Sequence, residues 1–305
     1  MTMGGASQTL PMPASAAISL PMSDFPTGEL IQLEPLVARV LAPNPSPYTF
    51  TGTQTHLVGT TDLAIIDPGP DDPRHLGALT AAIAGRPVTA ILVTHTHRDH
   101  SPLARALQAA TGAPIVGCAP LALDDLGPRA DAAFDRDYAP DRILGDGAQV
   151  AGAGWTLTAI LTPGHTSNHL AFALEDTKAL FPGDTVMGWS TTVVSPPDGD
   201  MADYLASLAK LMLRDDRVYY PAHGEAIATP RRFVRSLIGH RKQREGQILR
   251  LLARGVGEIP AMVEQMYVGL DPRLVPAAQG SVLAHLVDLE RRGRVRQEGG
   301  AWTAI

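Results

Sequence analysis

The sequence is poor in cysteine, in aromatic residues and in long apolar runs, and each scarcity excludes a class of protein. One cysteine, Cys118, among 305 residues leaves no internal disulfide framework and favours a reducing, cytoplasmic compartment. Aromatic residues make up 5% of the chain, so small aliphatic side chains must fill most of the core. No run of about 18 apolar residues occurs, so we expect neither a transmembrane helix nor a membrane partner.

The start of the sequence also lacks basic residues, the first being Arg39. A secretory signal begins with a positively charged segment, and the apolar, proline-containing start has none. We therefore expect a flexible N-terminal tail over residues 1–29.

Acidic residues outnumber basic ones, but the two kinds are unevenly distributed. The net charge of −6 argues against indiscriminate binding of nucleic acid by the whole surface. Residues 231–254 hold eight basic residues and one acid, so this segment carries +7 and the remainder −13. A solvated helix face is the simplest interpretation. The alternative is a surface that contacts phosphates or an acidic carrier protein, for which the candidate residues are Arg241, Lys242 and Arg244.

Strand and helix patterns alternate from about residue 52 to residue 230, which predicts a layered α/β domain. The apolar run Leu63–Ile66 ends in a turn, and Asp72 can cap a helix that begins at Pro73. Ala90–Val93 is apolar throughout, as expected of a strand covered on both faces. Asp200 can cap another helix. Further elements are expected as a helix from Pro102 and strands at 114–117, 155–161, 169–174, 178–181 and 218–220.

The pattern changes after Pro230. A long basic helix (231–254) is followed by a short helix near Pro260, a helix from about Ser281 and two short strands at 294–297 and 301–304. This order is typical of a winged helix, and it also occurs in plain structural appendages. We therefore divide the chain into the tail, a catalytic domain over 30–230, and a basic helix with a winged-helix-like domain over 231–305.

The segment from His95 to His100 carries the strongest chemical signal. Three imidazoles and a carboxylate in six residues, at the end of a buried strand, would be costly as packing alone because each needs a polar partner. A metal ion removes that cost, since imidazole nitrogens and carboxylates are suitable zinc ligands. His95 and His97 point the same way in an extended backbone and can hold one ion. The turn after them directs Asp99 and His100 toward a second position.

Three isolated residues share one local setting. His165, Asp184 and His223 each follow an apolar strand and lie beside glycine, where a tight turn holds a side chain at a sheet edge. Their common setting makes them further candidate ligands.

The motif His-x-His-x-Asp-His, followed in order by Gly-His, Gly-Asp and Gly-His, resembles that of the metallo-β-lactamase-fold hydrolases over residues 30 to 230. The resemblance implies an αββα sandwich with two metal ions, zinc in the first instance, although iron or manganese suits the same ligands. It assigns His95, His97 and His165 to the first ion. It assigns Asp99, His100 and His223 to the second, with Asp184 as the bridge. Asp67 matches a position that supports the ligands from behind.

The resemblance also implies the chemistry. Two zinc ions that share a water lower its pKa enough to give hydroxide near neutral pH. That hydroxide attacks an electrophilic carbon or phosphorus, and Asp99 is the candidate catalytic residue that orients it and takes its proton. The expected reaction is hydrolysis.

The segments Gly52–Gly59 and Thr162–His169 resemble the lactamase-β-like branch, which carries a C-terminal winged-helix-like domain. That branch includes endoribonucleases specific for single strands and thioesterases that release acyl chains from carrier proteins. His169 matches a branch position, as a substrate contact or as support for a ligand, and the alternative of equal weight is an unligated structural histidine. The chain departs from the branch at Gln54 and His56, where Asn and Tyr are usual, and at Pro102-Leu103, where Gly-Gly is usual.

Three hypotheses follow. The first is a dinuclear zinc hydrolase acting on a small ester, thioester or lactone, with the acyl group free or on a carrier protein. The second is an endoribonuclease that uses the basic helix to hold single-stranded RNA. The third is a non-catalytic nucleic-acid-binding protein whose winged helix uses Arg291, Arg292, Arg294 and Arg296. The substrate and the oligomeric state stay open, and a homo-oligomer is compatible with the sequence.

Overall fold

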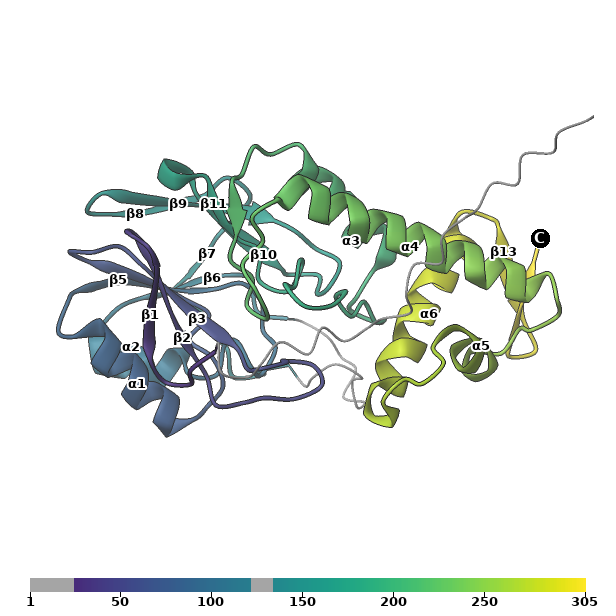
Figure 1. Ribbon diagram of the computed structural model, residues 1–305, viewed down its shortest axis with the longest axis horizontal. Helices are drawn as coiled ribbons and strands as arrows, with labels where there is room; N and C mark the ends of the chain where they lie inside the picture. Colours follow the sequence, from purple (N-terminus) through teal and green to yellow (C-terminus); the bar gives the residue numbers. More distant parts are fainter. Residues whose placement is uncertain (1–24, 122–133) are drawn as a thin grey trace, which may run out of the picture.

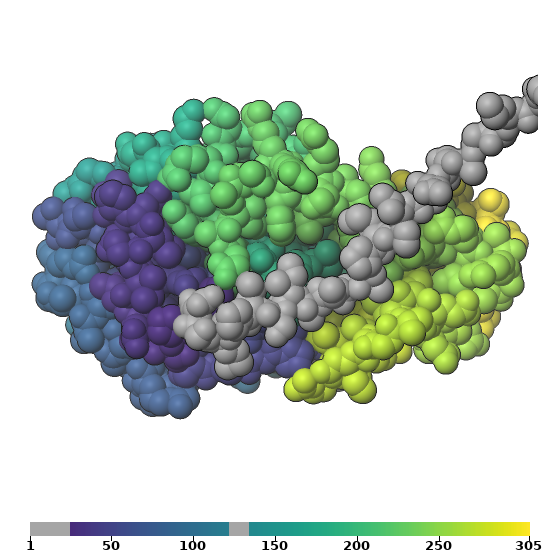
Figure 2. Space-filling view, viewed as in Figure 1, coloured from purple at the N-terminus to yellow at the C-terminus, as the bar shows by residue number. Residues whose placement is uncertain are grey.

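The computed structural model describes residues 25–121 and 134–305. Two β-sheets face each other, with helices on the outer face of each, and a small helical domain follows (Figure 1). In the space-filling view, the C-terminal residues form a lobe beside the two-sheet domain (Figure 2). The four helices that cover the sheets are α1 (Pro73–Ile83), α2 (Ala104–Thr111), α3 (Met201–Met212) and α4 (Pro230–Leu252).

The first sheet has the order β1-β2-β3-β4-β5-β6-β7 among the described residues. Neighbouring strands are antiparallel from β1 to β4 and parallel from β4 to β7. The carboxyl ends of β4 and β5 therefore meet at one edge, where Asp67 and the histidine motif begin. The strands are β1 (Leu30–Glu34), β2 (Val37–Leu41), β3 (Gln54–Val58), β4 (Leu63–Ile66), β5 (Val88–Val93), β6 (Ile115–Gly117) and β7 (Arg142–Ile143).

The second sheet has the order β12-β11-β10-β9-β8. It is antiparallel except for the pair β11 and β12. The β9–β10 turn and the carboxyl ends of β11 and β12 lie at one edge, and these three places carry His165, Asp184 and His223. The strands are β8 (Gln149–Gly152), β9 (Trp155–Leu161), β10 (Leu170–Leu174), β11 (Ala179–Phe181) and β12 (Val218–Tyr219).

The main core fills the space between the sheets and beneath α1 and α2. Ile65 and Ile91 of the first sheet share this core with Phe172 and Phe181 of the second. A second core lies on the other face of the second sheet, where α3 and α4 pack. The two cores together make the four-layer αββα arrangement that the resemblance implies.

The C-terminal lobe has a core of its own. It is built by α5 (Ile259–Met266), α6 (Val275–Arg291), the hairpin β13 (Val295–Glu298) and β14 (Ala301–Ala304), and the end of α4. Val234 and Leu237 of α4 belong to the second core, whereas Ile248 and Leu251 belong to the third. The helix α4 is therefore shared by the catalytic layers and the C-terminal lobe.

Most local predictions are confirmed. Asp72 and Asp200 cap α1 and α3 through side-chain bonds to backbone N–H groups. The helix expected from about Ser281 is wrong at its start, because α6 begins at Val275 with a proline in its first turn. The tail expected over residues 1–29 lies outside the described residues except for residues 25–29, of which Phe25 is buried. No helix in the described ranges is long and apolar enough to span a membrane.

Gly164 allows the turn that carries His165 to lie against the start of α3. Its φ is +130°, and a Cβ atom there would overlap the backbone of Tyr204. We therefore predict that Gly164→Ala lowers the free energy of unfolding by about 2 kcal/mol or more. The measurement is denaturant unfolding.

Gly77→Ala is the matched control, because Gly77 lies on the exposed side of α1 and a Cβ there meets nothing within 4 Å. This substitution should raise stability by about 0.5–1 kcal/mol through helix propensity. Equal effects of the two substitutions would contradict the role given to Gly164.

Candidate metal centre

The seven predicted ligands converge at the edge where the two sheets meet. The loop after β5 supplies four of them, and the second sheet supplies the other three. Their side-chain atoms form three groups, and within each group the ligand atoms lie within 4.8 Å of one another. The groups are His95, His97 and His165; His95, His100 and Asp184; and Asp99, His100 and His223.

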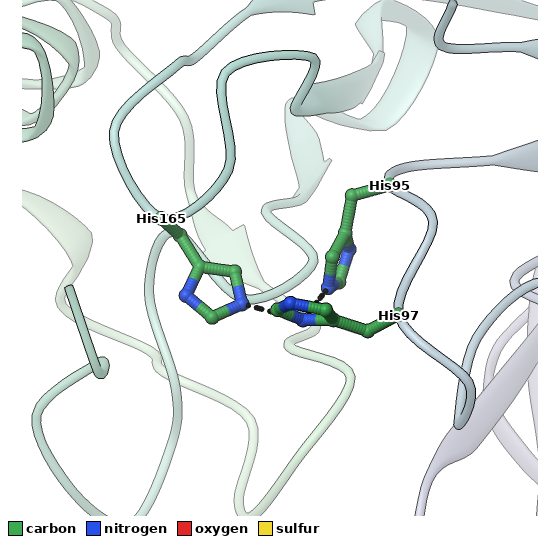
Figure 3. Close-up of side chains that lie close together, drawn as sticks. All are labelled: His95, His97 and His165. Atoms are coloured by element: carbon green, nitrogen blue, oxygen red, sulfur yellow. Dashed lines mark hydrogen bonds between the residues drawn. The ribbon is translucent and has the colours of Figure 1, made fainter. Parts of the chain in front are cut away.

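The first group is a cluster of three buried imidazoles (Figure 3). His97 Nδ1 lies 3.0 Å from His95 Nε2 and 3.0 Å from His165 Nε2. Three ring nitrogens that face one another away from water have few ways to satisfy their lone pairs. A transition-metal ion among them would accept all three.

The second group combines two imidazoles with a carboxylate. Asp99 Oδ2 lies 3.2 Å from His100 Nε2 and 3.1 Å from His223 Nε2. It also accepts a hydrogen bond of 3.2 Å from Thr53 Oγ1. The two imidazoles are buried, whereas the Asp99 side chain is 18% exposed. Asp99 is therefore the ligand candidate of this group that solvent or a substrate can reach.

Asp184 lies between the two groups and turns one oxygen toward each. Its Oδ2 is 3.7 Å from His165 Nε2, and its Oδ1 is 3.6 Å from His100 Nε2 and 3.4 Å from His223 Nε2. Both His100 Nε2 and Asp184 Oδ1 are buried without a hydrogen-bond partner in the described chain. Orphaned buried polar atoms of this kind are costly, and a metal ion beside them would remove the cost.

Three of the imidazoles are held by an acceptor on the side that faces away from the other ligands. The Nδ1–H groups of His100, His165 and His223 donate to Asp67 Oδ2 (3.0 Å), the Val193 carbonyl (2.7 Å) and the Gly52 carbonyl (3.2 Å). A proton on Nδ1 leaves the Nε2 lone pair directed into the site, as metal ligation requires. Asp67 thus lies where the resemblance places it, and it also accepts bonds from the Thr94 N–H and hydroxyl, each of 2.8 Å.

His169 and His56 lie outside the ligand groups. His169 is fully buried behind Asp184, whose backbone N–H donates to His169 Nε2 at 3.1 Å. That position allows support of Asp184 and leaves no face for a substrate. His56 packs against the rings of Phe181 and Tyr220. Burial, reinforced by the charge of Arg39, lowers the pKa of His56 to about 3, so this imidazole is neutral.

The electrostatics of the cluster favour the ligand forms of His95 and Asp184, whereas they favour the protonated form of His223. Burial and the neighbouring His100 and His97 lower the pKa of His95 well below its usual value. Burial alone would raise the pKa of Asp184, but the charges of His223 and His100 outweigh it and hold that pKa well below the ordinary range. Conversely, burial alone would lower the pKa of His223, yet Asp184 and Asp99 raise it to about 10. A metal ion would displace a proton from such an imidazole.

The expected external contact is wrong for Arg241, whose side chain is only 3% exposed. It donates to the carbonyl of Thr192 inside the protein. Position 241 faces inward because α4 packs on α3 through a stripe that includes Val234 and Leu237. Arg244 is half-buried and bonds Gln247 and the Met266 carbonyl. Lys242 is exposed.

Sequence reasoning named no role for three supporting groups. They are the Thr53 hydroxyl, the Gly52 carbonyl and the Val193 carbonyl, which bond Asp99, His223 and His165. Two of these are backbone atoms, which any residue type would supply, so the pattern carries no signal for them. Thr53 and Gly52 lie in the segment Gly52–Gly59, which only the family resemblance singles out.

Comparison with known proteins agrees with this geometry. Residues 48–223 match the model of the metallo-beta-lactamase superfamily, and residues 259–302 match the beta-lactamase associated winged helix domain. A beta-lactamase-like protein 2 homolog of Caenorhabditis elegans is 32% identical over 72% of each chain. An atrochrysone carboxyl ACP thioesterase of Aspergillus fumigatus is 30% identical over 85% of this chain and 78% of its own.

Among solved structures, a beta-lactamase domain protein from Burkholderia ambifaria superposes with a TM-score of 0.76. It is 22% identical, and the match covers 93% of this chain and 96% of that one. The fold class and the winged-helix-like domain expected from the sequence are thereby confirmed. The chain belongs to the metallo-beta-lactamase superfamily of metal-dependent hydrolases.

Proposed function

We propose that the protein is a dinuclear metal-dependent hydrolase that cleaves an acyl ester, thioester or lactone. The observation that carries this proposal is the position of Asp184, with one carboxylate oxygen toward each imidazole group. Seven converging ligands exceed the four that one tetrahedral zinc accepts, whereas two ions that share a bridging carboxylate account for all seven.

The donor set fits divalent transition metals. Five imidazoles and two carboxylates suit zinc, and they also suit iron or manganese. When bound, two such ions supply a nucleophile at neutral pH by lowering the pKa of water, and they polarise the substrate oxygen.

The protein's own residues supply position and proton transfer. Asp99 lies at the accessible side of the centre, held by Thr53 Oγ1, where it can orient a water and accept its proton at Oδ1 or Oδ2. The buried imidazoles exclude solvent from the far side. Asp67 keeps His100 in the tautomer that leaves Nε2 free.

An acyl group on a carrier protein is the substrate class we favour. A relative that is 30% identical is named as a thioesterase for an acyl carrier protein. The basic helix also presents fewer positive charges to RNA than its composition indicates, because Arg241 is buried and Arg244 bonds within the protein. Exposed Lys242 is then a candidate contact for an acidic carrier surface.

We predict two transition-metal ions per chain, and Asp184→Ala should lower the affinity for both because each ion would lose an oxygen ligand. Elemental analysis of unchelated wild-type and variant protein measures this. Asp215→Asn serves as the control, since that carboxylate is 77% exposed and belongs to none of the ligand groups. Loss of only one ion from the Asp184 variant would refute the bridge, and a single ion in the wild type would refute the dinuclear centre.

The substrate class is tested by direct turnover. Metal-loaded protein should hydrolyse an acyl thioester on a carrier protein and should leave labelled single-stranded RNA intact. A lactone and a cephalosporin complete the panel, and a chelator-treated sample reports metal-independent background. Cleavage of RNA without any thioesterase activity would reverse the assignment.

A further inference from the structure

Arg241 is a buried cation that the chemistry proposed above does not use. Its guanidinium donates through Nη2 to the Thr192 carbonyl and lies over the ring of Tyr204, 5.2 Å from its centre. It forms no ion pair with a carboxylate of the described residues, and its Nε is buried without a hydrogen-bond partner. Burying a charge without a counter-ion is costly, so a residue kept in this state needs a reason.

The segment that Arg241 contacts supports two of the ligand candidates. Thr192 Oγ1 donates to the Asp184 carbonyl at 2.7 Å, so this residue bonds Arg241 on one side and Asp184 on the other. The next carbonyl along the chain, that of Val193, accepts the Nδ1–H of His165 at 2.7 Å. The peptide units of Thr192 and Val193 therefore lie between Arg241 and the metal centre.

The ring beneath Arg241 contacts the same segment. Tyr204 of α3 donates through its hydroxyl to the Thr185 carbonyl at 3.1 Å, one residue after Asp184. The Thr192 hydroxyl also lies 3.2 Å from that carbonyl. Arg241 and Tyr204 thus hold the two ends of the turn from Asp184 to Val193.

We propose that Arg241 is a positioning residue for the metal centre. By fixing the Thr192 carbonyl, it orients the turn so that Asp184 and His165 present their ligand atoms to the ions. The inference rests on the proposed dinuclear function. It also gives α4, which lies between the two ranges matched by the family models, a part in the active site.

Arg241→Met tests the inference, because it removes the donor and the charge while it keeps an unbranched side chain. We expect metal affinity to fall by about 10-fold to 100-fold, as is typical when a partner behind a metal ligand is lost. Competition with a chromophoric chelator measures the affinity, and circular dichroism verifies the fold. Arg235→Met, on the exposed face of the same helix, is the matched control and should match the wild type.

A second readout does not depend on metal. In the chelated protein, amide hydrogen exchange over residues 184–194 should be faster in Arg241→Met than in the wild type and unchanged in Arg235→Met. Arg241→Lys, which can still donate to the Thr192 carbonyl, should restore part of the protection and part of the affinity. A merely structural role would lower overall stability without this local signature.

If Arg241→Met does not fold, a double-mutant cycle with Arg241→Lys and Thr192→Val tests the inference in its place. Because both changes act on one chain of bonds, the double variant should lose less affinity than the two single losses predict together. Additive losses, or wild-type affinity and exchange in the folded Arg241 variants, would overturn the inference. Fewer than two ions in the wild type would overturn the proposed function instead. The exchange experiment would still test whether Arg241 orders the segment 184–194.

Discussion

The structure depends on gathering five buried imidazoles and two carboxylates within a few ångströms of one another. Burial disfavours the charged forms of such groups, the attraction between Asp184 and His223 opposes that effect, and buried polar atoms without a partner are costly as well. His100 Nε2 and Asp184 Oδ1 show the difficulty directly, since neither has a hydrogen-bond partner in the described chain. Bound metal ions would resolve the conflict. The fold is arranged to make their site, because two sheets end at one edge and each end contributes ligands.

The ligands lie on separate turns, so each one needs its own hydrogen-bond partner to fix its orientation. Different elements hold different imidazoles. Asp67, at the end of a strand, bonds His100, and the loop carbonyl of Val193 bonds His165. The turns themselves need glycine. At Gly164 a side chain would collide with α3, and at Gly183 it would meet the ring of His169. Close packing behind the ligands therefore restricts residue type at positions that never touch a metal.

Apolar runs and turn chemistry predicted most helices and the strands β4 to β6 and β9 to β12, but they missed β1, β2 and β3. The ligands could be found because each combines a metal-binding side chain with a strand end. The strands β7 and β8 were also missed, because most of their residues are exposed and they form no apolar run. The prediction for Arg241 failed for a different reason. Its spacing from Val234 and Leu237 places it on the inward stripe of α4, whereas its charge led us to expect it at the surface. The supporting position of Asp67 came from family resemblance, and its pairing with His100, 33 residues away, emerged only from the tertiary structure.

Because the Arg241 side chain faces inward, the basic segment presents fewer charges to solvent than its composition indicates. A charge of +7 over residues 231–254 indicates a surface for polyanions when every charge is counted as exposed. Arg241 instead stabilises a loop of the catalytic layers, and Arg244 bonds the Met266 carbonyl and lies 4.2 Å from the centre of the Tyr267 ring. Two of the three central cations thus join α4 to its neighbours. The helix then connects the C-terminal lobe with the layers that carry the candidate metal centre, and the exposed charges that remain, among them Lys242, are the ones open to an external contact.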